Sequence, residues 1–169
     1  YFATDPVAMD CVGWRIIDNE VRLNHGAGLT IGSSGVARGN WIHDNGQIGA
    51  KLQGNGAVFE GNLVHDNNFA KVYRSFEAGG AKGSGVGLRF LGNCVYGNDG
   101  SGLWADVGSS GVVFEGNTVF RNAYQGIFYE ISTGGLIRNN LVGLPLDLDP
   151  RRVDAPQAPP HLDVRAPGR

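Results

Sequence analysis

The chain has 169 residues, a formal net charge of -2 and 18% charged residues, which suits a single domain. This balance gives no basic footprint for nucleic acid and no polybasic segment for a membrane surface. No apolar run approaches the ~20 residues that a membrane-spanning helix needs. We therefore expect neither a nucleic acid nor a membrane as the partner.

An asparagine that recurs along the chain marks an internal repeat. The marks are separated by 21, 22, 31, 24 and 23 residues, and in five of the six units a second asparagine follows five residues later. The first set is Asn19, Asn40, Asn62, Asn93, Asn117 and Asn140. The second set is Asn24, Asn45, Asn67, Asn98 and Asn122. Units this short bury a core only by stacking, so they predict a solenoid. Asparagine side chains bond turn backbone and one another, which favours a structural role for both sets.

Three apolar columns accompany the asparagines, and the sequence around them alternates with the strand period of two. The first column, three residues before each mark, is Ile16, Ala37, Phe59, Phe90, Phe114 and Ile137. The second, two residues after the mark, is Val21, Ile42, Val64, Val95, Val119 and Val142. The third, five residues after the second asparagine, is Leu29, Ala50, Val72, Leu103 and Ile127. We predict an all-β right-handed parallel β-helix of about six coils, because variable coil length disfavours the stricter left-handed hexapeptide form.

The repeat also predicts the domain organisation. The β-helix is expected over residues 1–143, with a loop insertion at 70–87, where one interval is longer than the others. Residues 144–169 hold most of the prolines and no apolar column, so we expect a poorly ordered tail. Cys11 and Cys94 fall about three coils apart, which predicts two unpaired thiols. The abrupt start leaves open that the chain is part of a longer protein.

The repeating N-x-V-x-x-N and G-x-G-[L/I] units resemble those of the pectate-lyase-like superfamily of right-handed parallel β-helices. The runs Glu77–Lys82, Gly102–Asp106 and Gly126–Ile131 are similar to those of its secreted bacterial members. The resemblance covers roughly residues 12–143. It implies a secreted protein that acts on a polysaccharide, without specifying the sugar or the bond, because fold alone does not fix function.

Most candidate site residues lie six and eight residues after the second asparagine of a coil, where the side chains should face outward, and the others come from the loop 70–87. We expect an acidic ladder beside an aromatic pair, with polar residues at both ends and in the loop. The acidic ladder and the loop lysine, as catalytic candidates, are Glu77, Asp106, Glu130 and Lys82. The candidates for substrate binding are Lys51, Gln53, Arg74, Trp104 and Phe128.

Several chemistries fit this outward face. Carboxylates on adjacent coils, ~5 Å apart, have the separation of paired glycosidase carboxylates. The same three carboxylates are alternatively Ca²⁺ ligands, with a lyase that uses Lys82 or Arg74 as its base. A third reading is a non-catalytic glycan-binding or structural module, whose exposed Trp104 and Phe128 stack on sugar rings. His43 and His65 share another outward column, but two histidines alone do not make a metal site.

Overall fold

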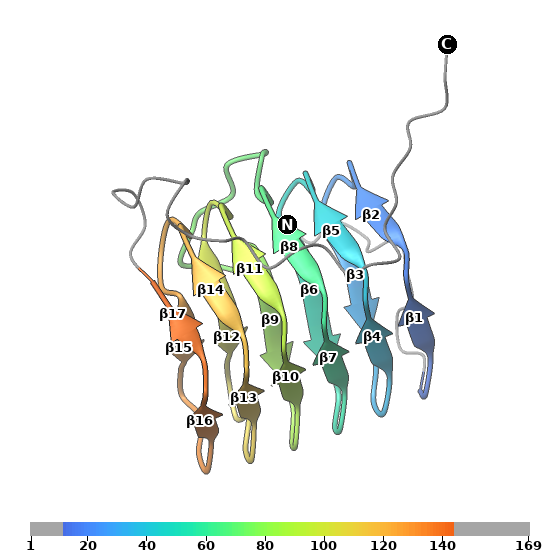
Figure 1. Ribbon diagram of the computed structural model, residues 1–169, viewed down its shortest axis with the longest axis vertical. Helices are drawn as coiled ribbons and strands as arrows, with labels where there is room; N and C mark the ends of the chain where they lie inside the picture. Colours follow the sequence, from blue (N-terminus) through green and yellow to red (C-terminus); the bar gives the residue numbers. More distant parts are fainter. Residues whose placement is uncertain (1–11, 144–169) are drawn as a thin grey trace.

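The computed structural model describes residues 12–143, which coil into a parallel β-solenoid with three sheets running along its axis (Figure 1). Sheet A contains β1 (Arg15–Ile17), β4 (Val36–Arg38), β7 (Val58–Glu60), β10 (Arg89–Leu91), β13 (Val113–Glu115) and β16 (Leu136–Arg138). Sheet B contains β2 (Glu20–Arg22), β5 (Trp41–His43), β8 (Leu63–His65), β11 (Cys94–Tyr96), β14 (Thr118–Phe120) and β17 (Leu141–Val142). Sheet C contains β3 (Ala27–Ile31), β6 (Ile48–Gln53), β9 (Gly79–Ser84), β12 (Ser101–Ala105) and β15 (Ile127–Tyr129).

The predicted apolar columns form the core between the three sheets. Parallel pairing aligns the first column along sheet A and the second along sheet B, one residue per coil, as predicted. Phe59, Phe90 and Phe114 are fully buried, and the last two stack with ring centroids 4.8 Å apart. Because successive coils add the same inward residues, the core runs from Ile16 to Val119, whereas Ile137 and Val142 at the last coil are about half exposed.

The third column and the loop were predicted wrongly in part. Ala81, not Val72, pairs with Ala50 and Leu103 in sheet C. The residues that make this coil longer than the others lie between β8 and β9. Residues 79–84, which were predicted as part of the loop, form strand β9. We call residues 69–78 the insertion. The chain leaves the regular coil after Asn68, whose N–H still donates to Asn45 O, and returns to it at Gly79.

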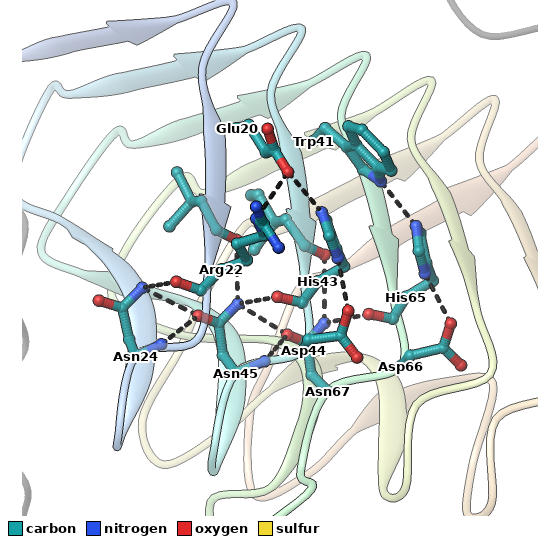
Figure 2. Close-up of polar contacts among 12 residues, drawn as sticks. Glu20, Arg22, Asn24, Trp41, His43, Asp44, Asn45, His65, Asp66 and Asn67 are labelled. Carbon is teal, nitrogen blue, oxygen red and sulfur yellow. Dashed lines mark hydrogen bonds and ion pairs between the residues drawn. The ribbon is translucent and has the colours of Figure 1, made fainter. Parts of the chain in front are cut away.

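The two asparagine sets form hydrogen-bonded ladders, as predicted. In the ladder of Figure 2, Asn45 Nδ2 donates to Asn67 Oδ1 at 2.9 Å, and Asn24 Nδ2 donates to Asn45 Oδ1 at 2.9 Å. The same Oδ1 atoms accept the backbone N–H of the preceding coil's asparagine. Each side chain thereby pairs polar groups that the turns would otherwise bury unsatisfied. The asparagines hold the coils together, and those inside the ladders are buried and already fully paired.

A column of glycines lets sheet C pass close to the second asparagine ladder. A Cβ on Gly49 would lie 2.6 Å from Gly80 O and 2.9 Å from Asn67 Nδ2. A Cβ on Gly102 would meet Gly126 O and Asn122 Nδ2 at 2.6 and 2.8 Å. These positions need glycine because no space exists for a side chain.

Some predictions fall outside the described residues, namely those on the tail 144–169 and on Cys11. Cys94 is a half-buried free thiol, and burial raises its pKa to about 11. Within residues 12–143 there is no helix of the length and apolarity that could cross a bilayer.

Candidate functional site

The outer face of sheet C carries a column of side chains from five successive coils. Strand register places Thr30, Lys51, Lys82, Trp104 and Phe128 side by side. Lys82 was predicted in the loop but lies in β9, directly between Lys51 and Trp104. Two lysines on adjacent strands would repel each other unless carboxylates lay close to both.

Two carboxylates meet that requirement. Lys82 Nζ lies 2.7 Å from Asp106 Oδ2 and 2.9 Å from Glu77 Oε1. Lys51 Nζ lies 3.5 Å from Glu77 Oε2. The side chains of Lys51, Lys82 and Asp106 are each about one-tenth exposed or less, and Glu77 is 22% exposed. We call these four residues the sheet C cluster. Its formal charges cancel, which buried ions require.

Glu77 reaches the cluster by a different route from the one predicted. The predicted column position beside Asp106 belongs to Ser84, which pairs with Gln53 in register. Glu77 instead is the next-to-last residue of the insertion, two residues before β9, with a left-handed φ of 59°. The insertion therefore carries a carboxylate from outside the regular coil onto the two lysines.

Asp106 and Glu130 occupy equivalent places on successive coils, as predicted. Asp106 N donates to Gly83 O, and Glu130 N donates to Ala105 O. Their side chains differ in their contacts. Asp106 pairs with Lys82, and the second carboxylate on Lys82 is Glu77, not Glu130. The calcium site considered for Glu77, Asp106 and Glu130 is not formed: nowhere in residues 12–143 do three His, Cys, Asp or Glu side chains gather to hold a metal ion.

Trp104 was predicted to be exposed, and this was wrong. Only 3% of it is exposed, because Lys82 Nζ sits 3.8 Å from its ring centroid on one side and Phe128 stacks at 5.4 Å on the other. Its indole Nε1 is buried without a hydrogen-bond partner. Trp104 therefore supports the cluster through a cation–π contact and offers no open ring face to a sugar. Phe128 is only half-buried and keeps part of its surface in solvent.

The remaining predicted residues lie at the edge of the cluster or away from it. Gln53 is exposed and lines a hollow of about 30 Å³ together with Lys51, Glu77, Lys82 and Ser84. That volume is enough for an ordered water, which needs ~10–15 Å³, and is far below the ~300 Å³ at which ligand pockets begin. Arg74 is bound to Asp99 instead of contributing to the cluster.

The sheet B histidines form a separate polar stack (Figure 2). Their rings lie 5.0 Å apart and nearly parallel. His43 contacts Asp44 through Nδ1 at 2.7 Å and Glu20 through Nε2 at 3.3 Å. His65 contacts Asp66 through Nδ1 at 2.8 Å, and Trp41 Nε1 donates to its Nε2 at 2.6 Å. All four ring nitrogens are engaged, so this stack is structural. Sequence reasoning missed these partners, although the His-Asp-Asn run occurs twice.

Comparison with known proteins agrees with this architecture. Residues 7–143 match the family model described as "Right handed beta helix region". No curated protein matches the chain. The matched region covers most of the chain and includes all three sheets and the insertion, so the chain belongs to the right-handed β-helix family, with the repeat fold of the pectate-lyase-like superfamily.

Proposed function

We propose that this protein hydrolyses a polysaccharide on the outer face of sheet C, with Glu77 as the proton donor and Asp106 as the nucleophile. The observation that carries this proposal is their convergence on Lys82 from different coils. The insertion delivers one carboxylate, and the end of β12 supplies the other. Since its substrate would be a polysaccharide, we further propose that the protein works outside the cell.

Their shared contact with Lys82 limits how far apart the two carboxylates can lie, and this limit is compatible with glycoside hydrolysis. Each has an oxygen within 2.9 Å of the same Nζ atom, so these oxygens lie less than about 6 Å apart. Retaining glycosidases hold their carboxyl groups about 5–5.5 Å apart. Asp106 accepts hydrogen bonds on both oxygens, from Val107 N and from Lys82, which suits the nucleophilic carboxylate. Glu77 is the more exposed of the pair, so we assign it the proton transfer to the leaving group. That role requires Glu77 to leave Lys51 and Lys82 and take up a proton when the insertion moves.

Elimination by a lyase fits the cluster less well. Lys82 would have to act as a base in its neutral form. Its Nζ already contacts two carboxylates and lies over the Trp104 ring, so the atom that would have to accept the substrate's proton is occupied by these three contacts. Lys82 is better suited to hold both carboxyl groups in place and to neutralise charge that develops between them.

A second candidate function is glycan binding without cleavage. The hollow at the cluster holds about 30 Å³, and both carboxylates are already paired. Cleavage requires the insertion to move so that a sugar ring reaches Glu77 and Asp106, whereas binding across the exposed edge of the face does not.

The test is an activity assay of the full chain on uronate and neutral polysaccharides. New reducing ends and the absorbance of unsaturated products are followed together. We expect reducing ends alone, with a loss of about 10²-fold or more in Glu77→Gln and in Asp106→Asn. Glu60→Gln is the matched control, because Glu60 pairs with Arg38 on sheet A. Unsaturated products would favour elimination. Glycan binding without products would favour the second candidate.

A further inference from the structure

A second hollow lies beside the insertion, apart from the residues of the sheet C cluster. It has a volume of about 330 Å³ and is lined by Lys71, Val72, Tyr73, Arg74 and Asp99. Ligand pockets commonly begin at about 300 Å³, so this hollow is large enough for a small ligand. Four of its five lining residues belong to the insertion, and Asp99 comes from the next coil.

Partly buried hydrogen bonds of one asparagine hold the segment that lines this hollow. Asn68 is fully buried and has a left-handed φ of 75°. Its Nδ2 donates to Val72 O at 2.8 Å and to Asp99 O at 2.7 Å, and its Oδ1 accepts Val72 N at 2.8 Å. One side chain thus ties the insertion to the following coil. The lining residues are therefore held in a defined arrangement before any ligand arrives.

Charged groups in the hollow are paired but remain accessible. Lys71 Nζ lies 3.1 Å from Asp99 Oδ2, and Arg74 Nε donates to Asp99 Oδ1. Partial burial of Asp99 acts to raise its pKa, but hydrogen bonds and charge from Lys71 and Arg74 lower it overall. The lysine and arginine side chains stay 75% and 55% exposed. A ligand can therefore reach the lysine and arginine donors directly, whereas Asp99 is 16% exposed and a ligand that bonds its oxygens shares them with Lys71 and Arg74.

An exposed aromatic ring completes the hollow. Tyr73 is 77% exposed, and Phe76 nearby on the insertion is 57% exposed. An open aromatic face beside paired polar groups matches the two surfaces of a pyranose ring, which presents C–H groups on its faces and hydroxyls at its edge. The carboxylate between Lys71 and Arg74 makes the site a poor one for a simple anion.

We propose that this hollow is a saccharide subsite in which Tyr73 stacks on a sugar ring while Asp99 and Arg74 bond its hydroxyls. The inference rests on the proposed function, because it takes the polysaccharide as the ligand. The stacking role that the sequence suggested for Trp104, which is buried, is here assigned to Tyr73, which is open to solvent. Tyr73 and Arg74 would position the chain that the sheet C cluster cuts.

The experiment measures binding of the full chain to xylan, polygalacturonate, alginate and soluble cellulose derivatives by affinity electrophoresis. Oligosaccharide fragments of any retarding polymer are then titrated by NMR. We expect Tyr73→Ala and Asp99→Asn each to weaken binding about tenfold, which corresponds to ~1.4 kcal/mol. Tyr73→Phe should keep most of the affinity, because the ring is retained. Tyr124→Ala removes a 46% exposed aromatic outside the hollow and should leave binding unchanged.

The outcomes separate this inference from the proposed function. Binding that depends on Tyr73, without release of reducing ends, would support the subsite and refute hydrolysis. Hydrolysis with equal KM in wild type and Tyr73→Ala would refute the subsite and leave the sheet C cluster standing. Failure of the wild-type chain to bind any of the polymers would overturn the subsite, and hydrolysis would then be judged by the activity assay alone. Equal loss of affinity in Tyr73→Ala and Tyr124→Ala would also overturn it.

Discussion

Replacing Asn93 with alanine tests whether the asparagine ladders stabilise the solenoid. Asn93 is only 1% exposed and sits near the middle of the first ladder. Its Nδ2 donates to Phe59 O and to Asn117 Oδ1, both at 2.9 Å. Its Oδ1 accepts the backbone N and the Nδ2 of Asn62, both at 3.0 Å. Alanine removes all four hydrogen bonds and leaves Asn62 N without this acceptor.

The structure sets the expected magnitude. A net contribution of about 1 kcal/mol per hydrogen bond gives a loss of about 4 kcal/mol in the free energy of unfolding. Asn19→Ala is the matched control, since Asn19 occupies the same ladder at its exposed end and also follows a residue with left-handed φ. Asn19 Nδ2 donates only to Ile17 O and Asn40 Oδ1, in partly solvated positions. That substitution should cost about 1 kcal/mol or less.

Urea unfolding followed by circular dichroism measures both variants. The slope of the unfolding free energy against urea concentration should be the same in both variants. The urea concentration at the unfolding midpoint should be much lower in Asn93→Ala than in Asn19→Ala. If the two variants lie within about 1 kcal/mol of each other, the ladder interior adds nothing beyond turn geometry and the reasoning fails.

Three further predictions concern packing, reactivity and pH. Gly49→Ala should destabilise the fold by about 1–3 kcal/mol in thermal unfolding, because its Cβ would meet Gly80 O, whereas Gly143→Ala makes only an ordinary 3.7 Å contact and should be neutral. Cys94, with its raised pKa of about 11, should react with iodoacetamide at pH 8 about a hundredfold or more slowly than in urea, as read by peptide mapping. Asp99 has a lowered folded pKa, so its stabilisation is complete above about pH 4–5 and lost as pH falls through the folded value. The stability difference between wild type and Asp99→Asn should therefore narrow between about pH 5 and 2, and a constant difference would contradict the ion pairing.

Much of the fold follows from the sequence because each coil repeats the same requirements. Asparagine and an inward apolar residue return at fixed offsets, so two columns and both ladders could be read directly. The prediction of the third column was wrong at one coil, because it counted five residues from Asn67 and the insertion separates Asn67 from the strand. The glycine column carried the missing signal: Gly80, like Gly49 and Gly102, precedes the inward residue, and aligning it selects Ala81.

The burial of site residues was harder to predict. Outward-facing positions in a strand pattern can be recognised, but their exposure depends on which residues lie beside them on neighbouring coils. Trp104 is covered because Lys82 occupies the adjacent place on β9 and Phe128 the adjacent place on β15. Since Lys82 was assigned to the loop, the sequence reading left Trp104 uncovered. An error in register at one coil thus became an error in exposure at the next.

The insertion connects the two candidate sites. Near its end, Glu77 contacts Lys51 and Lys82. In its middle, Tyr73 and Arg74 line the hollow together with Asp99. Both arrangements depend on where the insertion leaves and re-enters the coil, which Asn68 and β9 fix. A regular solenoid offers only flat, repeating faces, because each coil presents its side chains in the same directions. The insertion breaks that regularity at one coil, and this is where the described chain gathers charge and exposed aromatic surface.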